Sequence, residues 1–396
     1  MPNSKWSDDD FLNDLRRQVD TQADECLREL VAHGNESDFR NVFRQMTTND
    51  EPLPEGLPKA LRGFFEQTSG LPTLDGAPLD EARLARGSAV FLKHAFPSAL
   101  VLLAKSLPEG YSAPNLSLIL SLSDNLNRNP YRRLMGVLQL LVNLCAKTGF
   151  EKNGKGLVTA QKLRLLHAGV RQLAPKHLPD YAATYQQPCN QEDMLGTIMG
   201  FSLLVIEGLR ILGVPLAAED AEDYYYVWRI FAVLMGIHPP GRPDSSEIVP
   251  ADLTQARLFY DSFVRRHYRQ APENPKGAEL AGSLLRMMDR MLPRTPLRML
   301  GLRIVPRIYM EQLTGRGGMI RVGLRPVPLL FLTKWLLRML PRIWMWFWKE
   351  GDKLDPTGSV HENLSRIFFQ GLITRTAGGE VTFMVPRDMQ DLRELA

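Results

Sequence analysis

The sequence predicts an all-α protein, built as a single large helical domain. Apolar residues recur every three or four positions through most of the 396 residues, which is the spacing of half-buried helices. The alternation of apolar and polar residues that marks strands is almost absent, so only a short β element is expected, at residues 379–385. Hydrophobic residues make up 44% of the chain and charged residues 23%, a balance that predicts a large globular core.

Charge is spread unevenly along the chain. Residues 1–87 hold 17 acids and 10 bases, a net charge of −7, whereas residues 281–348 hold 12 bases and 2 acids, a net charge of +10. This asymmetry indicates either an anionic surface partner or internal docking of acidic onto basic regions. The overall net charge of +4 is too small to indicate nucleic acid binding. We predict an N-terminal helical extension over 1–50, a helical domain over 51–320, and a basic C-terminal segment and tail over 321–396.

Two features predict a location in the reducing cytoplasm. The N-terminus has no apolar stretch of the kind found in secretory signal peptides. The three cysteines, Cys26, Cys145 and Cys189, form neither a disulfide framework nor a CxxC metal motif.

The first helices are expected to be long. One begins at the capping residue Ser7 and continues to Gly34. Another covers residues 79–106 and is broken at Pro97, because the proline ring and its missing N–H disrupt a helix interior.

Residues 190–213 are predicted to form the most apolar helix, capped by Asn190. It is long enough to cross a membrane, but Glu207 and Arg210 lie one turn apart and favour a core helix that carries an ion pair. Further amphipathic helices are expected over residues 218–236, 250–268 and 275–292.

The stretch 159–171 is predicted to form the helix around which the fold is organised. Its apolar stripe carries His167, followed by two small residues that leave room beside the imidazole for a flat group. Arg164 and Arg171 lie one turn on either side, close enough to meet anionic groups of a ligand held there. Two interpretations stay open: a core histidine hydrogen-bonded to a neighbour, or an axial ligand to iron.

The predicted helix over residues 129–147 carries Arg133 at the edge of its buried stripe. An arginine there is either paired in the core or aimed into a cavity. Gly136 and Val137, on the next turn, leave space and offer no proton donor.

Residues 326–348 combine a basic stripe with an aromatic face. Four of the six tryptophans lie here, and Lys334, Arg338 and Arg342 repeat every four residues. This composition is typical of a helix that lies on an anionic membrane surface, although a helix packed on the core would also show it.

Several short motifs occur in a specific order between residues 55 and 315. They are Ser106-Leu107-Pro108, Arg132-Arg133-Leu134, Lys162 to Ala168 with Arg171, Asn190 to Asp193 leading to Gly196-Thr197, and Asn274 to Gly277. In this order and spacing they resemble the haem-dependent oxygenases typified by latex clearing protein (rubber oxygenase) and the fungal ER-bound oxygenase of mycophenolic acid biosynthesis.

The resemblance implies an all-α fold that encloses haem b, with His167 as the proximal iron ligand. Arg164 and Arg171 match motif arginines that order the proximal helix or reach the haem propionates. Arg133 matches the distal arginine, over the face where dioxygen binds. A fixed cation there would stabilise negative charge developing on dioxygen.

The sequence departs from the rubber-cleaving members of that family at three places. Those members carry a lysine and a threonine at the positions of Gly136 and Val137, and a glutamate on the preceding helix. Residues 112–122 of this chain contain no acid. Gly136 and Val137 are therefore expected to border the cofactor and an apolar substrate cavity, and no general base is identified.

These observations predict a haem b-dependent oxygenase that uses dioxygen on an apolar, isoprenoid-like or lipid-like substrate. It would be cytoplasmic, with residues 326–348 on a membrane surface. One alternative is a haem protein that binds or senses a diatomic gas, or uses peroxide, without cleaving an alkene. The other is a cofactor-free helical protein that binds lipid or a membrane.

Overall fold

The predicted all-α fold is confirmed by a computed structural model. It describes residues 4–32, 53, 56–70, 73–122, 130–146, 149–151, 154–291, 304–327 and 371. Within them every regular element is a helix, and the only β pairing is an isolated bridge between Leu74 and Ala77. The expected strand at 379–385, and residues 328–348 of the basic segment, lie outside the described residues.

The helices of the N-terminal half lead up to the stretch that carries His167. They are α1 (Asp9–Arg17), α2 (Thr21–Ala32), α4 (Lys59–Thr68), α5 (Glu81–Lys93), α6 (Ala95–Val101), α7 (Leu107–Tyr111), α8 (Pro114–Leu122), α10 (Pro130–Leu144) and α11 (Lys155–His177). A single π-helical turn, Leu102–Ser106, joins α6 to α7.

The second half completes the bundle around α13. Its helices are α12 (Tyr181–Tyr185), α13 (Gln191–Phe201), α14 (Leu203–Leu212), α15 (Ala218–Leu234), α16 (Leu253–His267), α17 (Pro275–Met291) and α18 (Val305–Arg321). The predicted helices over 218–236, 250–268 and 275–292 are confirmed to within a few residues.

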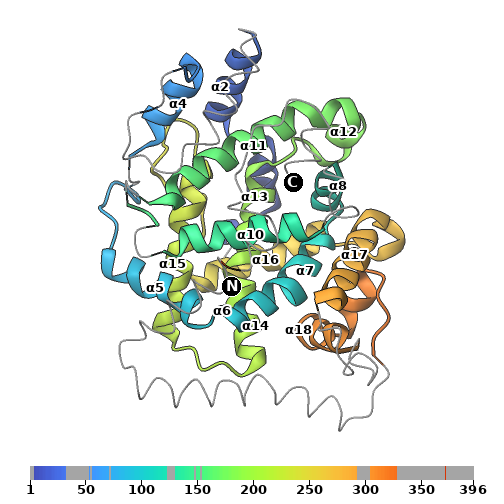
Figure 1. The fold of residues 1–396 in the computed structure, drawn as a ribbon. Coiled ribbons are helices and arrows are strands. Elements are labelled where there is room, and N and C mark those ends of the chain that lie inside the picture. The colour runs from blue at the N-terminus through green and yellow to red at the C-terminus, as the bar shows by residue number, and fades with distance from the viewer. Residues whose placement is uncertain are drawn as a thin grey trace.

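The bundle places helices on every side of α11. In Figure 1, α11 runs across the upper half of the molecule, with α10 below it and α2 and α4 above it. α8 also packs against α11, and α17 packs against both α8 and α10. The middle of α11 is therefore enclosed, which is the condition that a buried ligand site on this helix requires.

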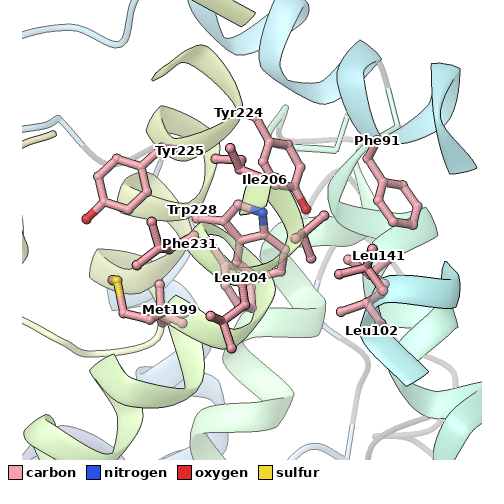
Figure 2. Close-up of a cluster of buried hydrophobic side chains, with 14 of the residues drawn as sticks. Phe91, Leu102, Leu141, Met199, Leu204, Ile206, Tyr224, Tyr225, Trp228 and Phe231 are labelled. Atoms are coloured by element: carbon pink, nitrogen blue, oxygen red, sulfur yellow. The ribbon is translucent and has the colours of Figure 1, made fainter. Parts of the chain in front are cut away.

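The main core is centred on Trp228 of α15. Its ring stacks on Phe201 at a centroid distance of 5.2 Å, and the rings of Tyr224 and Phe231 meet it edge-on at 6.3 and 5.6 Å. Figure 2 shows Trp228 with Tyr224 and Phe231 of the same helix and with Leu204 and Ile206 of α14. Such aromatic contacts add specific geometry to the burial of apolar surface and fix α15 against α13 and α14.

The expectation of one continuous first helix was wrong. Asp8, not Ser7, caps α1, and its carboxylate accepts the N–H of Asp10 at 3.0 Å. The helix ends at Arg17, and α2 begins at Thr21 after a break of three residues. The last of them is Asp20, whose carboxylate accepts the N–H of Ala23 at 3.2 Å. An acidic residue that caps a new helix therefore interrupts the apolar period.

The break expected at Pro97 lies three residues earlier, at His94. Pro97 occupies the third position of α6, within the first turn, where a missing N–H leaves no hydrogen bond unmade.

The apolar stretch 190–213 also divides in two. Asn190 caps α13 as predicted, with its side-chain oxygen accepting the N–H of Asp193 at 2.9 Å. The chain bends at Ser202, whose hydroxyl donates to the carbonyl of Ile198 at 2.8 Å, a bond that commonly bends helices. The pair is long and apolar enough to cross a membrane, but 67% of its most apolar window is buried inside the fold. Glu207 pairs with Arg257 of α16, not with Arg210.

We predict that Gly87→Ala destabilises the fold by about 1–3 kcal/mol, because α5 and α15 touch at this position. A Cβ on Gly87 would lie 2.1 Å from the carbonyl oxygen of Asp223. Gly63→Ala in α4 is the control, since its Cβ would meet nothing within 4 Å and alanine favours a helix by about 0.5–1 kcal/mol. Urea unfolding measures both, and a Gly87→Ala protein as stable as the wild type would contradict the close packing.

Candidate functional site

α11 carries the site and is the longest helix described, at 23 residues. It starts after Gly154 and continues through Pro175, which lies in the last turn, to Leu178. Unlike an ordinary amphipathic helix, it is buried on nearly all sides. Charged residues on such a helix must find partners within the fold.

His167 lies half-buried in the middle of α11 and lines a small, partly open cavity of about 10 Å³. The cavity is bordered by side chains and backbone from the α1–α2 junction, α11, the start of α13 and residues 235–237. Among the described residues, no hydrogen bond involves the imidazole. The interpretation of a core histidine satisfied by a neighbour is therefore not supported by the described contacts.

The imidazole is neutral near pH 7. Burial, with the positive charge of Arg171, lowers the pKa of His167 to about 4, and Asp20 opposes this only in part. A neutral imidazole has a free nitrogen lone pair, which is the form that ligates a metal. The residue therefore fits the role of an iron ligand in its charge, its exposure and its freedom from a hydrogen bond.

The two arginines beside His167 are both paired with the N-terminal region. Arg164 donates from Nε and Nη2 to the two carboxylate oxygens of Asp20, at 2.6 and 2.8 Å. Arg171 donates to Asp24, with Nη2 2.7 Å from Oδ1. Of the two expected roles, these contacts support ordering of the α11 helix, because both guanidinium groups are already neutralised by carboxylates.

A second charged network joins α1 to the start of α13. Arg16 is buried and its Nη1 donates to Asp193 at 2.8 Å and to Glu192 at 3.2 Å. Arg266 and His267 of α16 contact the same Glu192, at 2.9 and 3.0 Å. This network fixes the N-terminus of α13 next to the cavity that His167 lines.

α10 places the other predicted site residues near α11. Gly136 is buried and Val137 half-buried in the second turn, and the helix packs against α11. Arg133 lies in the first turn, but its side chain is outside the described residues.

α8 presents an apolar surface close to the same helix. Leu116, Ile119 and Leu120 are only half-buried although they belong to one of the most apolar helices of the fold. α8 carries no acid, as the sequence shows. Glu109 on the preceding α7 lies near Lys105 and Arg321, at 3.9 and 3.5 Å, so it contributes to a cluster of charges on another side of the bundle.

Comparison with known proteins identifies the family. Residues 87–342 match the family model described as "ER-bound oxygenase mpaB/B'/Rubber oxygenase, catalytic domain". The chain belongs to this family. Its membership confirms the resemblance that the short motifs indicated, and the matched residues include all of α10 and α11.

Two relatives illustrate how far the similarity to the rubber oxygenase family extends. The rubber oxygenase of Streptomyces sp. (strain K30) is 25% identical over 280 residues, which is 69% of this chain and 65% of the length of that relative. A solved structure of latex clearing protein LCP in the closed state superposes with a TM-score of 0.65 at 23% identity. The superposition covers 83% of this chain and 90% of the latex clearing protein chain, and it shows that the two share a fold.

Sequence reasoning missed the residues that surround His167 from other elements. Asp20 and Asp24 neutralise its flanking arginines. Gln191 lines the cavity with a buried Oε1 that has no hydrogen-bond partner among the described residues. The one signal for the aspartates was the net charge of −7 over residues 1–87, which indicated internal docking as one of two possibilities. Among the described residues, Asp20 and Asp24 dock on α11, and Asp9 docks on α16.

We predict that Arg16→Met destabilises the protein by about 3–5 kcal/mol, because Glu192 and Asp193 would remain buried with one cation fewer. Arg17→Met is the matched control: Arg17 is exposed and pairs with exposed Asp14, so its loss should cost less than about 1 kcal/mol. Chemical denaturation at neutral pH measures both variants. If Arg16→Met were as stable as Arg17→Met, the buried network around Arg16 would contribute nothing to the stability of the fold.

Proposed function

We propose that this member of the rubber oxygenase family is a haem b-dependent oxygenase that acts on an apolar, isoprenoid-like or lipid-like substrate. The observation that carries the proposal is a neutral imidazole, His167, that lines an open cavity and makes no hydrogen bond among the described residues. Haem b bound there would supply an iron centre that binds and activates dioxygen.

The residues of this chain would hold the cofactor and shape its surroundings. His167 would ligate the iron, and the pairs Arg164–Asp20 and Arg171–Asp24 would keep its helix in place. Arg133 would place a fixed positive charge where electron density builds up on dioxygen, which is the usual way a protein stabilises such charge.

An apolar substrate is supported by the character of the helices that pack on α11. α8 contributes half-buried leucine and isoleucine side chains, and Val137 of α10 contributes another apolar surface. Such surfaces bind hydrocarbons and exclude water from the reacting atoms. The relative from Streptomyces is named for rubber, a hydrocarbon polymer, and this name supports the same class of substrate.

We expect the wild-type protein to take up haem b and show a Soret band, and His167→Ala to lose haem while keeping its helical circular dichroism. His177→Ala is the matched control, because this histidine lies at the exposed end of the same helix. Full haem occupancy with an unchanged spectrum in His167→Ala would exclude His167 as the ligand. A wild-type protein that binds no haem would exclude the proposal and leave the cofactor-free lipid-binding alternative.

Arg133→Ala should retain haem but lose most oxygen consumption with alkene substrates, whereas Arg133→Lys, which keeps the charge, should retain part of it. We expect a loss of about tenfold or more, since the removal of one charge-stabilising donor typically costs 10²–10³ in rate. If Arg133 instead forms a structural ion pair, Arg133→Ala would lower the melting temperature and leave turnover per bound haem unchanged. Haem uptake without any turnover in the wild type would favour a gas-binding protein over an oxygenase.

A further inference from the structure

The cavity beside His167 is bordered on one side by a segment that lies outside the matched family domain. The family model begins at residue 87, whereas the α1–α2 junction, residues 18–20, reaches the cavity through Asp20. This junction is not part of either helix, so its position depends on the contacts it makes with α11, α13 and the loop after α15.

Asp20 contacts both arginines that flank the histidine. Its two carboxylate oxygens accept from Arg164 at 2.6 and 2.8 Å, in the paired geometry that is strongest between guanidinium and carboxylate. Its backbone carbonyl accepts from Nη2 of Arg171 at 3.3 Å. Burial alone would raise the pKa of the Asp20 carboxyl, but Arg164 holds it below its usual range, so the group is charged.

The loop after α15 is shaped to accept this carboxylate. Gly236 has a φ of +81°, and a Cβ at this position would lie 2.8 Å from both Cγ and Oδ2 of Asp20. Only glycine combines that backbone conformation with that close approach. Gln191 links the same parts, because its N–H donates to the carbonyl of Gln18 at 2.9 Å and its Nε2 to the carbonyl of Gly236 at 2.8 Å.

We propose that Asp20 is a positioning residue for His167. By holding Arg164 and the backbone contact to Arg171, it would fix the rotation of α11 and the direction of the imidazole, and its charge would offset the two guanidinium groups. The inference rests on the proposed function, since a fixed imidazole is useful only if it binds a ligand. Outer groups that orient a ligating histidine commonly change metal affinity by 10–100-fold.

Asp20→Asn keeps the shape of the side chain and removes its charge. We expect haem affinity to fall by about 10–100-fold and the iron–histidine stretching band of the reduced protein to shift. Asp14→Asn is the matched control, because this aspartate lies on α1 and pairs with an arginine at the exposed surface. An unchanged band and affinity in Asp20→Asn would overturn the proposal, as would a lower melting temperature with an unchanged band.

Gly236→Ala tests the same contact from the opposite side. The added methyl group should displace the Asp20 carboxylate and reproduce the effects of Asp20→Asn. Gly241→Ala is its control: Gly241 also has a positive φ, +73°, but its Cβ would meet nothing within 4 Å. If Gly241→Ala gave the same loss of affinity and band shift as Gly236→Ala, backbone strain and not Asp20 would be the cause, and the proposal would fail.

A measurement on cofactor-free protein separates this proposal from the proposed function. The rate at which diethyl pyrocarbonate modifies His167, followed by mass spectrometry, reports the accessibility of the imidazole without haem. We expect Asp20→Asn and Gly236→Ala to modify several times faster than wild type, and the two controls to match it. Equal rates in all proteins would overturn the role of Asp20 even if haem binds. Faster modification of the two variants, together with a wild type that binds no haem, would retain that role and reject the proposed function.

Discussion

The constraint on which this fold most depends is that buried guanidinium groups must be neutralised. Arg16, Arg164 and Arg171 are each less than a tenth exposed, and each is paired with carboxylates from an element distant in the sequence. A single charge left unpaired in such a position costs several kcal/mol, comparable to the whole stability of a domain. Two of these three pairs tie the N-terminal region to α11, and the third ties it to α13.

This constraint makes the N-terminal region a structural part of the bundle. Asp20 lies in the break between α1 and α2, and Asp24 lies in the first turn of α2, so the interruption of the helix places two carboxylates in front of α11. A continuous helix over the same residues would put its acids on a solvated face. The family match from residue 87 onward includes α11 and its two arginines, while the carboxylates that neutralise these arginines come from residues before the match.

The sequence predicted the helices of the fold better than it predicted the contacts of the site. Helix period predicted most of the long described helices, because apolar spacing depends on nearby residues alone, but it did not predict α8 or α18. Helix ends near Ser7, Pro97 and Ser202 were predicted less well. Caps and bends depend on which of several nearby side chains forms a hydrogen bond with the backbone, and apolar spacing does not show this. His167 was identifiable from its motif. Asp20 was not, because a contact across 144 residues leaves no periodic signal.

The residues that would hold a cofactor and the residues that would take part in a reaction lie on different helices of this site. A neutral imidazole on an enclosed helix, held by paired arginines, depends on packing and burial that the whole family fold supplies. α10 and α8, which both pack on α11, carry Gly136, Val137 and no acid. Because apolar side chains at those positions cannot accept a proton, any oxygenase chemistry here must take its proton acceptor from another element, from bound water or from the substrate itself. The fold therefore constrains cofactor binding more strongly than it constrains the reaction, and changes on α8 and α10 can alter the chemistry while the charge pairs around α11 stay the same.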